Sequence, residues 1–473
     1  MASGYLLAIY FLVVAFAGLQ LKHKITAFKS PLSKVPGPWY APLTTLHLQY
    51  LFSTGTIWKL VERSHAKYGS IVRLGPRQVW ISDKEAMKEI LVKTDLPKVA
   101  MYAEISRDKF SPGLFGEIRP EPHKRLKRFL SPAFTVNYID NLETFFKTTV
   151  RDVLNKYQTQ INEDPVYYAK EGFEVDLMDD LHNVALDIMI EDGVDERIWK
   201  SIPRSIFDGL SKRYQTVYVK KFFRSFGIDI KFDWPAEMIT AIDAVVQRRK
   251  RTSEVERRDL LQHLIEEGKK PDTGTTMSAR DIVDQMAEVL LAGSETTSGT
   301  IGCLFLELAR NPDVRAKLLA TLPSKGFADE IVTSKSVRSE AQYEYLEACI
   351  KENLRLHPIA SEMGRRTGNQ WVKLCGYDLP PHTVVSASYR DLHRNEDYWP
   401  QAERFWPERW LSEDKREGAP APDFAWAEMR MVAANLLQRF DVLEVPGQEI
   451  DFRQYITMQF ATGHWKVMLR PRS

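Results

Sequence analysis

The sequence contains few cysteines, and their spacing excludes two common uses of this residue. Among its 473 residues are 3 cysteines, none in a C-x-x-C pair: Cys303, Cys349 and Cys375. An odd number of widely spaced cysteines predicts neither a disulfide framework nor a zinc knuckle. We therefore expect the folded part of the chain to lie in a reducing compartment.

The chain also has little net charge and lacks the short motifs of several enzyme classes. Its formal net charge is +2, which argues against a nucleic-acid partner. It contains no G-x-S-x-G, no G-x-x-x-x-G-K-[ST] and no H-E-x-x-H sequence, so hydrolase and nucleotide-dependent activities find little support. With 44% hydrophobic residues, 24 glycines and 25 prolines, the composition is that of a globular protein. We interpret the basic run 248–251 as a solvated helix face.

The amino terminus carries a long hydrophobic run. Residues Tyr5–Leu21 are apolar except for Gln20, and about 17 residues is the lower limit for a helix that spans a bilayer. Basic residues follow this run and none precedes it, which places the rest of the chain on the cytoplasmic side. The alternative is a cleaved secretory peptide ending near Ala17, but the basic region that begins such peptides is missing. We predict a membrane anchor over 1–21, a basic and proline-rich linker over 22–39 and a globular body over 40–473.

The body is predicted to be a single large domain, mainly α with a minority of β. Residues 69–82 read as two short strands joined by a Gly-Pro turn. The clearest helix runs from Ser278 to Arg310, with capping-box spacing at its start and an Asn-Pro step after its end. A helix of that length covers about 50 Å and must be central to a domain. A second helix is predicted over Ala341–Arg355, and short strands over Trp371–Ser388.

The centre of the long helix carries the run AGSETT, which is costly in a helix interior. A glycine there costs about 1 kcal/mol relative to alanine, and hydroxyl groups compete for backbone carbonyls. One interpretation is a ligand that approaches the backbone at Ala292 and Gly293, with Glu295 and Thr296 relaying protons to a bound species. The alternative is a helix crossing that needs small residues, with Glu295 on a solvated edge. These residues by themselves leave both interpretations open.

A second motif predicts a buried cluster of charges. Glu352 and Arg355 in KENLRLHP lie three residues apart and can pair on one helical face. The apolar residues around them indicate that this face is buried, and a buried charge needs partners. The downstream sequence PERW offers Arg409 as a third member of the cluster.

Taken in order, these motifs resemble a known family. A-G-x-E-T-T, then E-x-x-R, then P-E-R-W, behind an anchor and a proline-rich hinge, resembles the membrane-bound cytochrome P450 (haem-thiolate monooxygenase) family over nearly the whole chain. The segments beginning at Ile71, His123 and Asp391 are similar to filamentous-fungal members, many of which oxidise secondary metabolites. The resemblance implies the cytochrome P450 fold behind an N-terminal transmembrane helix. It also implies a single-pass protein of the endoplasmic reticulum membrane, with its catalytic domain facing the cytoplasm.

The resemblance also implies a cofactor and partners. The family binds haem, oxidises lipophilic small molecules and takes electrons from a membrane-bound, NADPH-dependent flavoprotein reductase. Its residues matching Glu295 and Thr296 steer protons to iron-bound dioxygen, and the step matching Ala292 and Gly293 forms the groove where oxygen sits.

Two further groups of residues have implied roles. The family's counterparts of Glu352, Arg355 and Arg409 lock the core beneath the haem and are structural. The helix matching His123 to Arg128 donates to the haem propionates through His123 and the residue four positions later. That residue is Lys127 here, where arginine is more usual, so a point charge replaces a bidentate contact.

The segment most diagnostic of the family is absent. In the family, a loop of the form F-x-x-G-x-R-x-C-x-G lies between P-E-R-W and a helix that begins A-W-A-E. Here Asp423 leads directly to Phe424 and that helix, and no cysteine follows Cys375. Of the three cysteines, two are expected on the predicted helices and Cys375 in a strand, so none matches the metal-ligand position.

This absence leaves the activity open between two classes of protein. The thiolate pushes electron density onto the iron and favours cleavage of the O–O bond, so the chain as written is expected to be catalytically impaired or inactive. A mistaken exon boundary or a recent lesion accounts for the gap, and the intact flanks favour this explanation. The alternative is a long-maintained, non-catalytic, membrane-anchored protein that binds a hydrophobic ligand or a partner.

Overall fold

The computed structural model describes most of the chain outside the amino terminus. The described residues are 18, 22, 25–26, 28–104, 112–131, 135–189, 223–228, 236–251, 260–270, 273–411 and 424–472. Nearly all of the predicted anchor (1–21) therefore lies outside them. The residues just before the Asp423–Phe424 junction also lie outside the described part, whereas the helix after the junction lies within it.

The chain forms two compact units from interleaved segments. The first unit combines Met1–Val99 with Glu362–Leu392, and the second combines Ala100–Ser361 with His393–Ser473. In both, more residues lie in helices than in strands, so the prediction of a mainly α fold with a minority of β is confirmed.

The first unit is built around a four-stranded sheet in the order β1-β2-β7-β4. Strands β1 (Ile71–Gly75) and β2 (Gln78–Ile81) form the antiparallel hairpin predicted for residues 69–82. Strand β7 (Val384–Ser388) pairs parallel to β2, and β4 (Glu362–Arg366) pairs antiparallel to β7. The remaining elements of the unit are η1 (Pro31–Lys34), α2 (Leu46–Ser53), α3 (Ile57–Tyr68), α4 (Lys84–Lys88), the π-helix η2 (Glu89–Lys93), β5 (Val372–Leu374), β6 (Tyr377–Leu379) and α18 (Tyr389–His393).

Two local predictions in this unit need correction. Cys375 does not lie in a strand but in the turn between β5 and β6, where its φ of 49° is left-handed. The packed body also begins before residue 40, because Leu32 and Val35 are 0% and 4% exposed. The proline-rich segment is thus partly core, and the amide of Arg73 donates to the carbonyl of Pro36 at 2.8 Å.

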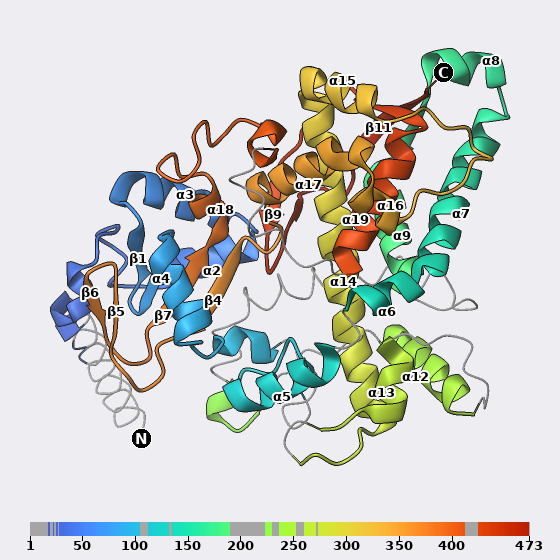
Figure 1. The fold of residues 1–473 in the computed structure, drawn as a ribbon. Coiled ribbons are helices and arrows are strands. Elements are labelled where there is room, and N and C mark those ends of the chain that lie inside the picture. Colours follow the sequence, from blue (N-terminus) through green and yellow to red (C-terminus); the bar gives the residue numbers. More distant parts are fainter. Residues whose placement is uncertain are drawn as a thin grey trace, which may run out of the picture. The chain divides into compact units, whose positions relative to one another are not determined.

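The second unit is organised around one long helix, α14 (Ala279–Arg310) (Figure 1). Ser278 caps it through a capping box with Asp281, and the helix ends before Asn311, as its sequence predicts. Helices α9 (Leu177–Met189), α12 (Ala236–Arg251), α17 (Glu344–Leu356) and α19 (Phe424–Leu437) pack against it. Other helices of the unit are η3 (Ala100–Glu104), α5 (Pro120–Leu130), α6 (Val136–Asn141), α7 (Glu143–Ile161), α8 (Pro165–Glu171), α13 (Leu260–Glu267), α15 (Pro312–Thr321), α16 (Ser334–Ser339), η5 (Ala341–Tyr343) and η6 (Pro407–Trp410).

Two small sheets complete the second unit. A three-stranded antiparallel sheet has the order β3-β11-β8, and a hairpin pairs β9 with β10. Their bounds are β3 (Phe173–Asp176), β8 (Phe440–Glu444), β9 (Phe452–Gln454), β10 (Met458–Phe460) and β11 (Lys466–Pro471).

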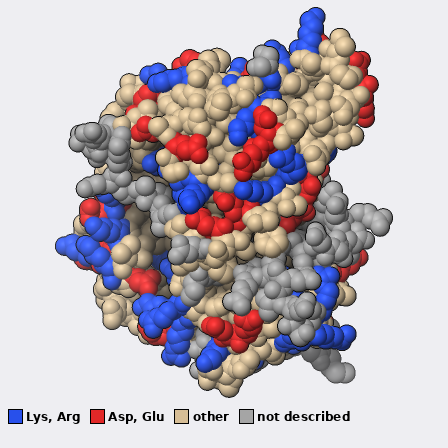
Figure 2. Space-filling model, turned by 45° about the vertical axis from the view of Figure 1, so that its right-hand side comes forward, with Lys and Arg blue, Asp and Glu red and all other residues tan. Residues whose placement is uncertain are grey.

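Within the described part of the chain, α14 is the helix that is long and apolar enough to cross a membrane. Of its most apolar window, 72% is buried inside the structure, which is the pattern of a core helix. On the face drawn in Figure 2, basic and acidic side chains are interspersed, in keeping with the small net charge.

We expect Gly37→Ala to destabilise the first unit strongly. A Cβ at Gly37 would lie 2.2 Å from the carbonyl oxygen of Arg73, and a backbone atom in a strand cannot move aside cheaply. We expect a loss of about 2 kcal/mol or more in the free energy of unfolding, measured by urea denaturation. Gly326→Ala is the control, because its Cβ would meet no atom closer than 3.6 Å; equal effects of the two substitutions would contradict this packing.

Candidate functional site

Most side chains of α14 are buried, but some residues at the centre of the helix are exposed or half-buried. Ala292 is exposed, Gly293 and Thr296 are half-buried, and Glu295 is buried. The hydroxyl of Thr296 donates to the carbonyl of Ala292 at 2.7 Å, so its oxygen can still accept a hydrogen bond. This open side of the helix therefore presents a hydroxyl oxygen next to two residues with little or no side chain.

Glu295 faces a different neighbour. Its Oε2 atom lies 3.5 Å from Nε2 of His182 on α9, and its carbonyl accepts a hydrogen bond of 2.7 Å from the amide of Gln459 on β10. The acid is therefore packed between helices and not on a solvated edge, contrary to the alternative raised from the sequence. Burial favours a low pKa for His182, but the carboxylate of Glu295 and the Met178 carbonyl outweigh this, and the pKa is raised above its usual value.

Helix α5 carries the three residues expected to meet the propionates. His123 is half-buried, whereas Lys127 and Arg128 are exposed. Leu126 and Leu130 of the same helix belong to a buried apolar cluster that also contains residues from the first half of α14. The cluster thus fixes α5 through its apolar face and leaves its basic side chains accessible.

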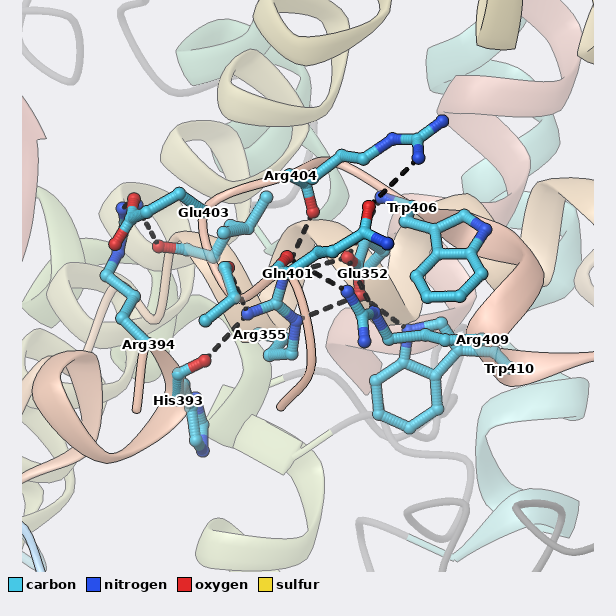
Figure 3. A network of polar contacts seen from close by, with 12 residues as sticks. Glu352, Arg355, His393, Arg394, Gln401, Glu403, Arg404, Trp406, Arg409 and Trp410 are labelled. Atoms are coloured by element: carbon cyan, nitrogen blue, oxygen red, sulfur yellow. Dashed lines mark hydrogen bonds and ion pairs between the residues drawn. The ribbon is translucent and has the colours of Figure 1, made fainter. Parts of the chain in front are cut away.

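Glu352, Arg355 and Arg409 are brought together in a buried network (Figure 3). The Glu352 carboxylate is 0% exposed and accepts from Arg355 at 2.8 and 3.0 Å and from Arg409 at 3.0 Å. The backbone amide of Trp406 and the indole of Trp410 donate to it at 3.0 and 2.9 Å. One carboxylate thus receives five hydrogen bonds, which offset the cost of burying its charge.

The two guanidinium groups extend this network to backbone carbonyls. Arg355 donates to the carbonyls of His393 and Ala402, both at 2.7 Å, and Arg409 donates to that of Pro400 at 3.1 Å. Because Arg355 lies on α17 and its partners lie on the segment 393–411, the network fastens that segment to the helix. Its geometry is that of a structural clamp.

Sequence reasoning missed several polar partners around these residues. His182 lies far from Glu295 in the chain, and no spacing in the sequence connects them. Burial favours a raised pKa for Glu307 of α14, but His357, which lies just after α17 and 2.6 Å from this carboxylate, helps to outweigh this, and the pKa is lowered. Trp410, whose indole donates to Glu352, belongs to the PERW motif. It is the one of these partners that the motif itself could have indicated.

We asked whether the residues present fit a haem-thiolate centre. The small residues Ala292 and Gly293 let a ligand approach the backbone of α14, but the thiols of the chain do not suit an iron ligand. Cys303 and Cys349 are 1% and 0% exposed within the main apolar cluster, and burial raises the pKa of the Cys349 thiol well above its usual value. Cys375 belongs to the first unit, and burial raises its pKa to about 11.

Among the described residues, no three His, Cys, Asp or Glu side chains gather where they could hold a metal ion by themselves. The burial of Cys303 and the raised pKa of Cys349 and Cys375 do not suit a thiolate ligand to haem iron.

A buried carboxyl near the Asp423–Phe424 junction was not anticipated. Glu428 in α19 is 1% exposed, and no described residue gives its Oε1 atom a hydrogen bond. Burial raises the pKa of Glu428 to about 8, so the group is largely neutral at pH 7. A carboxyl buried without a donor contrasts with Glu352, which has five.

A long core helix with exposed small residues, combined with a buried Glu–Arg–Arg clamp, agrees with what the resemblance to the cytochrome P450 family implied. The family model described as "Cytochrome P450" matches residues 35–466, and the chain belongs to that family.

Several known proteins are similar over most of their length. Cytochrome P450 monooxygenase FUS8 of Gibberella fujikuroi is 27% identical, over 94% of this chain and 89% of the relative. Cytochrome P450 monooxygenase acrD of Aspergillus aculeatus is 27% identical over 94% and 92%. Fusicoccadiene 8-ol C-16-hydroxylase of Phomopsis amygdali is 25% identical over 91% and 87%.

The fold is also that of a solved structure. The crystal structure of a cytochrome P450 (CYP102L1) superimposes with a TM-score of 0.66 at 20% identity, covering 88% of this chain and 94% of the other. The prediction of the cytochrome P450 fold is therefore confirmed.

We expect Glu352→Gln to lower the free energy of unfolding by about 3 kcal/mol or more, because it leaves two buried guanidinium groups without a counter-charge. Urea denaturation checks this value. The control is Glu330→Gln, since Glu330 is exposed and lies 3.9 Å from Lys147; we expect less than about 1 kcal/mol there. A loss at Glu352 no larger than at Glu330 would show that the clamp contributes little.

Glu428→Gln is expected to stabilise the chain increasingly as the pH rises. Glu428 keeps its proton when folded up to about pH 8, whereas the unfolded chain loses it near its ordinary value. Folding stability therefore falls by up to about 1.4 kcal/mol per pH unit between these values, and the glutamine variant lacks that loss. Urea denaturation at pH 5 and pH 8 measures the difference, with exposed Glu449→Gln as control; a pH-independent difference would contradict the raised pKa.

Proposed function

We propose that the chain has the architecture of a P450-type monooxygenase that oxidises a lipophilic small molecule in fungal secondary metabolism. The open side of α14 is the observation that carries this proposal, because Ala292 and Gly293 leave room for a flat cofactor beside the Thr296 hydroxyl. Glu295 and Thr296 are proposed to manage protons at this position. The relatives named as fungal monooxygenases and as a fusicoccadiene 8-ol hydroxylase support the substrate class.

Further residues are proposed to hold the haem and its surroundings. His123, Lys127 and Arg128 on α5 would meet the propionates, since the two exposed side chains are basic and accessible. The Glu352 clamp is proposed to keep the core beneath the cofactor rigid. When bound, haem would supply the oxidising chemistry, and a reductase that uses NADPH would supply electrons.

We also propose attachment to the endoplasmic reticulum membrane through the apolar segment 1–21. Three apolar side chains that follow this segment in the first unit are well exposed, namely Trp39 at 78%, Tyr50 at 68% and Leu46 at 57%. Leu46 and Tyr50 lie one turn apart on α2 and share a face. Such a surface favours contact with lipid next to an anchor.

We infer that the chain as written does not form a thiolate-bound haem and lacks ordinary monooxygenase activity. Cys303 and Cys349 are buried, and burial raises the pKa of the Cys349 and Cys375 thiols. A donor that must be a thiolate cannot be supplied by such groups. The second candidate is a non-catalytic role for a membrane-anchored protein with the P450 fold. The missing cysteine favours this role if the native protein, too, passes directly from Asp423 to Phe424.

Sequencing the mature transcript across the codons for Asp423 and Phe424 decides between these two. Extra in-frame codons supplying Gly, Arg and Cys would assign the native protein to the monooxygenases. A junction that stands as written would assign the chain to the non-catalytic class.

At the protein level, we expect the full chain reconstituted with haem to lack the thiolate signature in a reduced carbon monoxide difference spectrum. The matched control carries the corresponding loop of the FUS8 relative inserted between Asp423 and Phe424, and it should gain that signature. A thiolate-type spectrum from the chain without the insert would overturn the proposal, as would the failure of the correctly folded insert variant to show one.

A further inference from the structure

His182 is a buried histidine for which the family motifs give no role, and it lies against the acid of the AGSETT run. The side chains of His182 and Glu295 are 19% and 8% exposed. Helix α9 approaches α14 closely at this place because α14 carries glycines there. A Cβ at Gly302 would lie 2.4 Å from Sδ of Met178, one turn before His182 on α9.

The hydrogen bond at one ring nitrogen fixes the protonation of the other. Nδ1 of His182 lies 2.7 Å from the carbonyl oxygen of Met178. Because a carbonyl only accepts, Nδ1 carries a proton. Nε2 is then either unprotonated or, in an imidazolium, carries the second proton. It is buried, and no other described residue offers it a hydrogen bond.

A bare Nε2 would face the Glu295 carboxylate acceptor to acceptor at 3.5 Å. This arrangement is unfavourable in a buried place unless one proton lies between the two groups. The pair therefore holds one proton, either as imidazolium and carboxylate or as neutral imidazole and carboxylic acid.

The charged groups around the ring favour the first of these states. Glu295 on α14 and Asp179 on α9 both act on His182 and raise its pKa. From α7, Lys156 and Tyr157 engage Asp180 instead. From β11, Lys466 pairs with Glu174 at 2.7 Å, so the two lysines, Lys156 and Lys466, are paired with other carboxylates.

We propose that His182 is a positioning residue that holds the Glu295 carboxylate toward α9 and serves as its proton donor. In the transfer, the Nε2–H bond of the imidazolium breaks and an O–H bond forms on Oε2 of Glu295, leaving neutral imidazole and carboxylic acid. The inference deepens the proposed function, because it names the source of the proton that Glu295 would manage.

The test reads the pKa of His182 directly and needs no haem. Hydrogen–deuterium exchange at the C2 position of each histidine, followed by mass spectrometry of the full-length chain, gives individual pKa values. We expect His182 of the unaltered chain to titrate above an ordinary histidine. In Glu295→Gln its proton affinity should fall at least about tenfold, because burial then acts without the carboxylate.

Two further variants keep the result interpretable. Glu295→Asp keeps the negative charge but moves it away from His182 by one methylene group. It should therefore lower the proton affinity of His182 by less than Glu295→Gln does, and it keeps the test usable if Glu295→Gln folds poorly. His464→Gln is the control, since His464 pairs with Asp176 at 2.6 Å near the surface, and it should leave His182 unchanged. An unchanged pKa of His182 in both Glu295 variants would overturn the inference.

Failure of this inference and failure of the proposed function are distinguishable. The histidine titration depends only on the folded chain, whereas the carbon monoxide spectrum depends on haem ligation. In the loop-inserted chain, His182→Gln should leave the thiolate signature intact and alter only the pH profile of oxygen consumption. Loss of the thiolate signature in that variant would assign His182 a structural role instead.

Discussion

Much of the second unit depends on the solution to one electrostatic problem, a carboxylate with no exposed surface. Glu352 is buried on α17, and its charge is acceptable only because Arg355, Arg409 and two tryptophan N–H groups donate to it. Each arginine in turn uses its remaining donors on backbone carbonyls of the segment 393–411. This segment has little regular secondary structure, so backbone hydrogen bonds of a helix or sheet do not hold it in place. The contacts of the two arginines set its position instead.

A second constraint sets how closely helices approach the centre of α14. Gly299 and Gly302 face Gln459 and Met178, and an added Cβ would lie 2.7 and 2.4 Å from their side chains. The small residues at Ala292 and Gly293 lie instead on the open side. The helix is thus packed closely where Gly299 and Gly302 meet β10 and α9, and it is uncovered about two to three turns earlier.

Local signals made much of this predictable, and tertiary contacts explain the rest. The capping box at Ser278 and the Asn-Pro step fixed the ends of α14 within one residue, because both signals act within a turn of the helix. The ExxR spacing predicted pairing because residues three apart share a helical face. The His182–Glu295 pair left no such trace, since the two residues meet only after α9 has packed on α14. The docking of the proline-rich segment on β1 was missed for the same reason.

The contrast between two buried glutamates indicates where the chain departs from its family. Glu352 has a complete set of donors, so the clamp holds without help from a cofactor. Glu428, five residues after the Asp423–Phe424 junction, is as deeply buried, yet its Oε1 atom has no donor and its pKa is raised to about 8. A buried carboxyl of this kind is stable only as the neutral acid or with a donor, and the described residues supply none to Oε1. The helix that follows the junction thus carries a carboxyl poorly suited to its place as an anion, whereas the carboxylate of the clamp has a full set of donors.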